Sequence, residues 1–215
     1  ETADDSALFQ SWGSITIINP LEKIWNGYSD TRMGASMDSY LNGYNDPRLP
    51  VYFQPVTEGD NKGEYRGVAN GMPNPQQDDY KAMSAPNVQE KSTDSPLRWM
   101  MASEVAFLRA EGAMRGWTAE MGGTAEEFYN KGIELSFLEN GLSADAAARY
   151  AADETSKPTD FTDVSAANTK YNISALGKIT IKWNAGASEE EQLERIITQK
   201  WIAMFPNGTE AWSEF

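Results

Sequence analysis

The prolines of this chain are unevenly distributed, and their positions limit the fold more than any other feature of the sequence. Seven of the ten prolines lie between positions 46 and 96. Proline removes a backbone donor and breaks helices, so this stretch is expected to form turns, short strands and irregular chain. Irregular segments of this length are rare in compact domains and are often functional. The sequence therefore predicts a long loop region bordered by helical segments.

Two helices are predicted directly after the proline-rich stretch. Apolar residues recur at intervals of three and four over positions 97–116, which predicts one helix with Trp99 on its apolar stripe. Thr124 and Glu127 have the spacing of a capping box and begin the second helix, which Asn140-Gly141 ends. A short link that contains glycine joins the two, so a helical hairpin is expected.

The C-terminal part of the chain contains the clearest helix signal. Ser188 and Glu191 form another capping box, and the acidic run 189–191 favours the positive end of the helix dipole rather than a catalytic site. Trp201 lies on the apolar stripe of this helix and is predicted to be a core residue. The helix is expected to end at 206–208, and a shorter helix is expected at 143–150.

Three further segments have weaker local signals. Asp30 and Thr31 are suited to cap a helix that runs to Leu41. Residues 14–18 and 178–183 are each compatible with a short strand or with extended chain. The pattern as a whole predicts a mostly α-helical protein with long loops and a few short strands, although no 34-residue helical repeat can be traced cleanly through the chain.

Charge and composition exclude several classes of function. The chain has 32 acidic and 18 basic residues and a net charge of −14, which disfavours nucleic acid and anionic lipid as partners. It contains no cysteine and no histidine, so thiolate chemistry, Ser-His-Asp triads and imidazole metal ligands are excluded. The polar start at Glu1 and the helix-like sequence at 210–215 lead us to expect a fragment of a longer protein.

Four segments together resemble the SusD-like (SusD/RagB) family. They are 46–53 (DPRLPVYF), 64–71 (EYRGVANG), 96–113 (PLRWMMASEVAFLRAEGA) and 196–212 (IITQKWIAMFPNGTEAW). Each motif is weak alone, but the four occur in the order found in the family and cover most of the chain. The match is to the C-terminal half of the family, without its N-terminal lipoprotein signal, lipidated cysteine and first helical repeats.

The resemblance implies both a fold and a function. It implies that residues 1–215 are the C-terminal portion of a single SusD-like domain, a tetratricopeptide-related helical scaffold. It implies a lipoprotein on the outer face of a Gram-negative outer membrane that captures a glycan and passes it to a TonB-dependent transporter of the SusC type. No enzymatic activity and no cofactor are expected from it.

The aromatic residues of the loops are the candidate ligand-binding residues. Sugar rings have apolar faces and polar rims, so flat aromatic side chains beside hydrogen-bonding groups suit them. Four aromatic residues lie in loops beside such groups: Trp25, Tyr28, Tyr65 and Tyr80. The opposing interpretation is that each one packs into the core or fixes a loop.

Three alternatives remain open from the sequence. A glycosidase needs two carboxylates about 5–10 Å apart across a cleft, and no pair stands out. A helical scaffold that binds only protein fits the same helices. A calcium loop at 60–64 is possible but falls short of the full ligand spacing. For the motif at 46–53, Asp46 and Arg48 are expected to fix the turn around Pro47 by a charged hydrogen bond.

Overall fold

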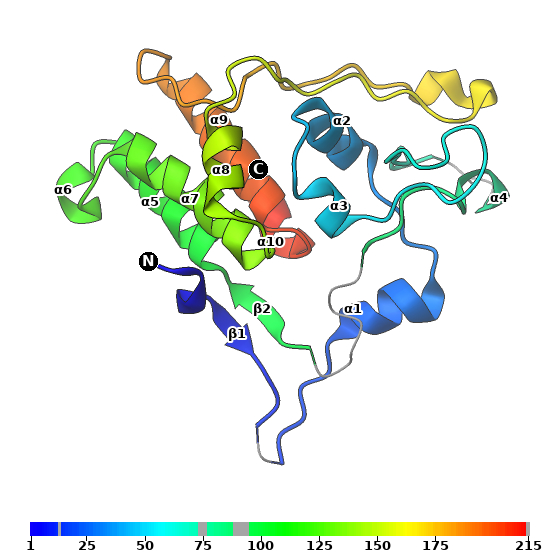
Figure 1. Ribbon diagram of the computed structural model, residues 1–215, viewed down its shortest axis with the longest axis horizontal. Coiled ribbons are helices and arrows are strands. Elements are labelled where there is room, and N and C mark those ends of the chain that lie inside the picture. Colours follow the sequence, from blue (N-terminus) through cyan, green and yellow to red (C-terminus); the bar gives the residue numbers. More distant parts are fainter. Residues whose placement is uncertain (13, 73–76, 88–94, 214–215) are drawn as a thin grey trace. The chain divides into compact units, whose positions relative to one another are not determined.

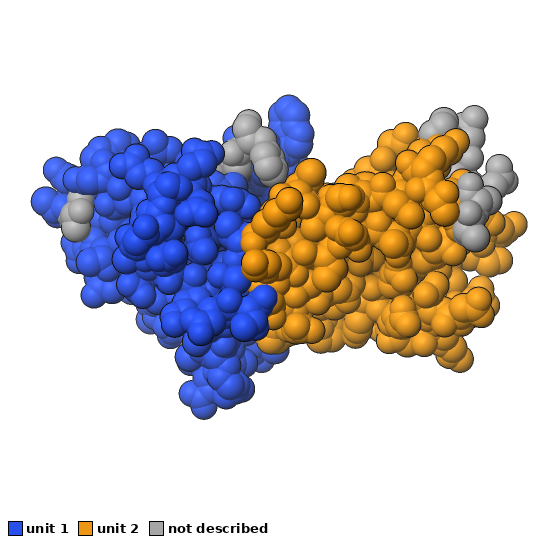
Figure 2. All heavy atoms as spheres, turned by 90° about the horizontal axis from the view of Figure 1, so that it is seen from above, with its two compact units in different colours: residues 1–9, 97–155, 179–215 blue, residues 10–96, 156–178 orange. Residues whose placement is uncertain are grey.

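The computed structural model describes residues 1–12, 14–72, 77–87 and 95–213. The chain divides into two compact units, each built from segments that are separated in the sequence (Figure 2). Unit 1 consists of residues 1–9, 97–155 and 179–215, and unit 2 consists of residues 10–96 and 156–178. The prediction of a mostly helical protein is confirmed, since the described residues contain two short strands and many helices (Figure 1).

Unit 1 contains the longer helices and a two-stranded antiparallel sheet. In chain order its elements are η1 (Ala3–Asp5), β1 (Ala7–Phe9), β2 (Leu97–Met100), α5 (Ala102–Met114), α6 (Thr118–Met121), α7 (Ala125–Glu139), α8 (Ala144–Ala151), α9 (Glu189–Ala203) and α10 (Gly208–Ser213).

Unit 2 has short helices joined by long connections, as the concentration of prolines predicts. In chain order its elements are α1 (Pro20–Glu22), η2 (Lys23–Tyr28), α2 (Ala35–Gly43), α3 (Leu49–Tyr52), α4 (Gln77–Tyr80) and η3 (Ala166–Tyr171). Figure 1 draws α1 and η2 as one continuous coil.

The core of unit 1 is centred on the contact between α5 and α7. The two helices approach closely at Gly132, where a Cβ atom would lie 2.7 Å from the ring of Phe107. The Tyr129 ring packs edge-on against Phe107 and contacts Trp183, with centroid distances of 6.2 and 5.2 Å. Its hydroxyl donates to the backbone carbonyl of Ile181 at 2.5 Å, which fixes the extended segment before α9 against the bundle.

Three predicted helix starts in unit 1 are confirmed by the observed caps. The hydroxyls of Thr124, Ser143 and Ser188 accept bonds from backbone amides in the first turns of α7, α8 and α9. Such caps satisfy amide groups that have no partner within the helix. Capping residues act on the adjacent turn, so these boundaries can be read from the sequence.

The single helix expected at 97–116 is wrong in its first turn. Residues 97–100 form β2, which pairs with β1 in the register Phe9 to Leu97, and the helix α5 begins only at Ala102. Trp99 is therefore not on a buried helical stripe; its side chain is 64% exposed. A strand partner about ninety residues away leaves no local periodicity, so the pairing was invisible in the sequence.

Other weak assignments are resolved in favour of extended chain. The helix expected from Asp30 starts instead at Ala35, because Met33 donates to the Ser84 carbonyl and accepts from the Val68 amide, both at 2.8 Å. Residues 14–18 show only an isolated bridge between Trp12 and Ile15, and residues 178–183 have no strand pairing.

Trp201 is only partly buried, so the prediction that it is a core residue is wrong. The buried residues of α9 are Arg195, Ile196, Thr198, Gln199, Lys200, Ile202 and Ala203. Polar side chains in this set find partners: Gln199 donates to the Tyr150 hydroxyl at 3.1 Å. The most deeply buried side of α9 therefore differs from the apolar stripe predicted from the sequence.

Glu139, at the end of α7, joins the N-terminal segment to the first turn of α5. Its carboxylate accepts from the amide and the hydroxyl of Ser103, at 2.9 and 2.6 Å, and from the Ser6 hydroxyl at 3.2 Å. The Ser6 hydroxyl in turn accepts from the amide of Ala102 at 3.0 Å. Two first-turn amides of α5 are thereby satisfied by groups outside the helix.

The pH dependence of unfolding should show this burial. Burial raises the pKa of Glu139 above that of a free glutamate, against the hydrogen bonds from Ser103 and Ser6 and the charge of Arg98. Its contribution to stability is therefore present below the unfolded pKa, about 4.3, and is lost as pH rises through the higher folded pKa. Between these two pKa values the free energy of unfolding of the wild type should fall relative to that of Glu139→Gln. Urea unfolding at a series of pH values measures this difference.

Glu120→Gln, which changes an exposed residue of α6, is the control for net charge. The free energy of unfolding of the wild type, minus that of Glu139→Gln, should fall as pH rises. If this difference stays constant or increases with pH, the burial of Glu139 is not what shifts its pKa.

Candidate functional site

The segment 81–85 holds several loops of unit 2 together. Its backbone atoms form hydrogen bonds with those of Met33, Gln54, Thr57 and Arg66. Satisfying backbone groups in this way makes irregular chain rigid without regular secondary structure. The candidate aromatic residues are carried by loops or short helices that are bonded to this segment or adjoin it.

Trp25 and Tyr28 lie on η2. The preceding α1 begins at Pro20 because Asn19 caps it, with its side-chain oxygen accepting from the Leu21 amide at 3.0 Å. After Tyr28 the chain turns at Ser29, whose φ is +52°. The Tyr28 side chain is 64% exposed and Trp25 is half-buried, so Tyr28 is the more accessible of the two rings.

Arg32 ties the end of this segment to the loop 81–85. Its guanidinium donates to the carbonyls of Ser29 and Thr31, at 3.0 and 2.8 Å, and through Nε to the Lys81 carbonyl at 3.1 Å. Burial lowers the pKa of the Arg32 guanidinium below its ordinary value, while the charge of Asp30 opposes that shift. The cation is thus occupied with backbone carbonyls, and it serves to position the loop.

Tyr65 belongs to the loop 64–71, which α2 holds from one side. The amide of Gly67 donates to Asp38 at 2.6 Å, and the Asn42 side chain bridges Asp38 and the Tyr65 carbonyl, at 2.9 Å to each. The Arg66 guanidinium lies 3.5 Å from the same Asp38 carboxylate. The backbone of Tyr65 is therefore fixed, and its ring is half-buried.

Tyr80 is a core residue, which corrects its assignment as a stacking residue. Its side chain is 5% exposed and packs with Val56 and Met83. Its hydroxyl lies 3.0 Å from an Asp163 oxygen and accepts from the Asn168 side chain at 2.7 Å. Burial is the main cause that raises the pKa of Tyr80. A ring enclosed in this way has no free face for a sugar, so its role is to join the 77–80 helix to the 163–168 segment.

Several exposed aromatic residues lie outside the set predicted from the sequence. Trp12 in unit 2 is 82% exposed, in the turn closed by the bridge to Ile15. In unit 1, Phe9 and Trp99 form an edge-to-face pair with ring centroids 4.7 Å apart. The predicted helix placed Trp99 on a buried face, so its exposure was not expected. Trp12 lies outside every predicted helix, and this position could have marked it as an exposed aromatic residue.

The chemistry of this region suits binding. Exposed and half-exposed rings stand beside carboxylates, amides and backbone groups, which is the combination that sugar rings require. For the calcium alternative, the loop 60–64 turns at Gly59 and Gly63, both with positive φ. Among the residues that the structure describes, no group of three or more carboxylates is placed to hold a metal ion.

The fold and this region define a helical scaffold that presents aromatic residues on rigid loops. A family model described as SusD-like, "Susd and RagB outer membrane lipoprotein", matches residues 1–215. The chain therefore belongs to the SusD-like family, and the resemblance inferred from its motifs is confirmed. In the part of the chain that the structure describes, no helix has the length and apolar character needed to span a membrane.

Solved structures of the family are similar over the whole chain. A chitin-binding SusD homolog from Flavobacterium johnsoniae is 39% identical with a TM-score of 0.86, and the match covers 99% of this chain and 42% of that one. A SusD homolog from Bacteroides thetaiotaomicron is 42% identical with a TM-score of 0.85, covering 100% and 42%. A SusD-like protein from the same organism is 41% identical with a TM-score of 0.87, covering 100% and 43%.

This chain thus spans less than half the length of these relatives. No curated protein sequence matches it.

Proposed function

We propose that this chain is part of a cell-surface protein that binds an oligosaccharide or polysaccharide and delivers it to a TonB-dependent transporter of the SusC type. The observation that carries the proposal is the exposed Tyr28 with Trp25 on η2, and Tyr65 on the loop 64–71, on segments that hydrogen bonds fix within unit 2. Family membership supports the same function, since one similar structure is a chitin-binding SusD homolog. The protein acts as a binder and not as an enzyme.

We propose that the ligand is a neutral glycan. Two cations near the rings, Arg32 and Arg66, are occupied by backbone carbonyls and by Asp38. We therefore expect the affinity for the ligand to depend little on salt concentration, because a neutral glycan displaces few counterions.

The test is titration calorimetry against neutral oligosaccharides, including oligomers of chitin, using the chain and three alanine variants. We expect at least one of Trp25→Ala, Tyr28→Ala and Tyr65→Ala to weaken binding about tenfold or more, because a stacking ring often contributes about 2 kcal/mol. Tyr28→Ala should have the largest effect, since its ring is the most exposed of the three.

Leu176→Ala is the matched control, because Leu176 is an 87% exposed apolar residue of unit 2 outside these loops. It should bind like the wild type, and circular dichroism should show all four variants folded. If the three aromatic variants bind as tightly as the wild type, the site does not lie on these loops.

A further inference from the structure

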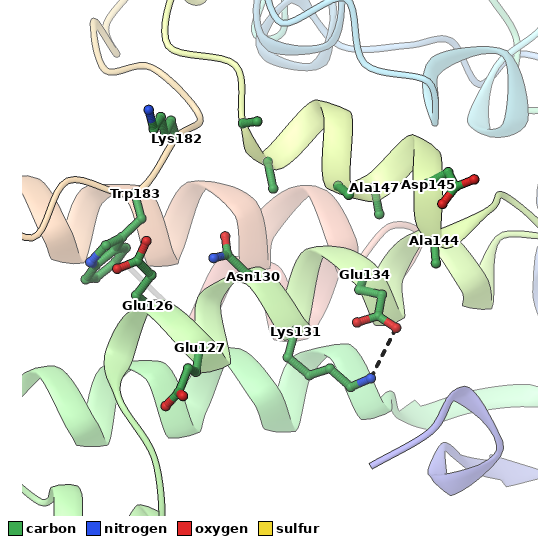
Figure 3. A pocket seen from close by; sticks show the side chains of 13 residues that line it. Glu126, Glu127, Asn130, Lys131, Glu134, Ala144, Asp145, Ala147, Lys182 and Trp183 are labelled. Carbon is green, nitrogen blue, oxygen red and sulfur yellow. Dashed lines mark hydrogen bonds and ion pairs between the residues drawn. The ribbon is translucent and has the colours of Figure 1, made fainter.

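Unit 1 contains a groove of about 770 Å³ between α7 and α8. Its walls are one side of each helix, and residues Lys182 and Trp183 close it at one end (Figure 3). The volume lies within the range of about 300–1,000 Å³ that is typical of binding pockets. None of the aromatic residues proposed for glycan binding lines this groove, so its role is independent of the function proposed above.

The α8 wall of the groove is made of alanine. Ala144, Ala147, Ala148 and Ala151 recur at intervals of three and four, so they share one face of the helix. Ala147 is buried, whereas Ala144 and Ala148 are exposed. Side chains this small let the backbone of another helix approach closely, and they offer few groups that could fix the orientation of a small polar ligand.

The α7 wall is polar, and the residues that line the groove include four carboxylates and two lysines. Lys131 pairs with Glu134 at 3.3 Å, and Lys182 pairs with Glu154 at 3.0 Å, so both cations of the groove are neutralised within unit 1. Glu126 and Asp145 are exposed and lie toward opposite ends of the groove in Figure 3. The groove therefore has an apolar wall of small residues and a net negative lining, with one carboxylate toward each of its two ends.

We propose that this groove is a docking site for an amphipathic α-helix of a partner protein, with small apolar residues on its buried face and lysine or arginine beside them. A helix laid into a groove between two helices is a recurrent mode of recognition. By electrostatic complementarity, the negative charges of the groove favour a partner helix that carries positive charge. A second copy of this chain is disfavoured as the occupant, because its net charge is −14 and α7 and α9 begin with acidic first turns.

The test uses a fluorescent helical peptide of alanine and lysine, and a matched peptide with glutamate in place of lysine. Fluorescence anisotropy at low ionic strength should show binding of the lysine peptide and not of the glutamate peptide. Ala148→Phe, which fills the groove from an exposed position, should weaken binding about tenfold or more. Ala185→Phe adds the same ring at an exposed position outside the groove and should leave the affinity unchanged.

Charge reversal separates this specific binding from general attraction to an acidic protein. Glu126→Lys with Asp145→Lys should abolish binding of the lysine peptide, whereas reversal of the equally exposed Glu189 and Glu190 should weaken it only slightly. Equal losses in the two double variants, or equal binding to Ala148→Phe, would overturn the proposal. Sedimentation that shows self-association of the chain, lost in Ala148→Phe, would assign the groove to a second copy and would also overturn it.

Discussion

Asp46→Ala is expected to lower the free energy of unfolding by about 3–5 kcal/mol, because it removes one partner of a buried ion pair and leaves the other in place. The two side chains are completely buried, and the Arg48 guanidinium bonds both carboxylate oxygens, at 2.9 Å through Nε and 2.7 Å through Nη2. Asp46 also accepts from the Arg48 amide at 2.9 Å. Removing the carboxylate leaves a buried cation without its bidentate partner, so urea unfolding should show a much lower midpoint.

The control is Asp78→Ala, which removes one partner of the exposed pair with Lys81. There the two side chains are 90% and 54% exposed, and exposed pairs contribute little. An Asp46→Ala midpoint equal to that of Asp78→Ala would contradict a structural role for the turn at Pro47.

Gly43→Ala is expected to cost about 3 kcal/mol, the upper part of the usual range for overpacking. Gly43 ends α2, and a Cβ atom there would lie 2.7 Å from Pro158 Cα and from the Thr159 nitrogen, and closer still to the Lys157 carbonyl oxygen. These are backbone atoms, so no side chain can rotate to make room. The same segment is hydrogen-bonded to α2, because the Thr159 amide donates to the Ser39 carbonyl at 3.0 Å.

Gly186→Ala serves as the comparison, since the nearest atom to its Cβ would be the Asn184 side-chain oxygen at 3.5 Å, an ordinary contact. It should change the free energy of unfolding by about 0.5 kcal/mol or less. If the two variants unfold at the same urea concentration, the 156–178 segment does not pack on α2 as described.

The parts of the fold that were predicted correctly are those whose cause is local. Thr124 and Ser188 cap the turn that follows them, and the turn at Asp46 and Arg48 is fixed by residues two positions apart. The errors arose where a distant segment decides the backbone. β2 forms because β1 pairs with it, and residues before Ala35 stay extended because Met33 bonds Ser84 and Val68.

The same distinction applies to the candidate site. Tyr28, Tyr65 and Tyr80 look alike in sequence, each an aromatic residue in a polar loop. Only the contacts of Tyr80 with Asp163 and Asn168, more than eighty positions away, make it a core residue. No local pattern could have separated it from Tyr28.

We propose that the glycan binds at η2 and the loop 64–71 of unit 2, and hydrogen–deuterium exchange tests this most directly. The exchange of backbone amides is measured with and without saturating amounts of the tightest-binding oligosaccharide of the panel. We predict slower exchange in peptides that cover residues 20–33 and 64–67, with no change in peptides from α7 and α8. Slower exchange confined to α7 and α8, or no change in either loop while calorimetry shows binding, would contradict the claim.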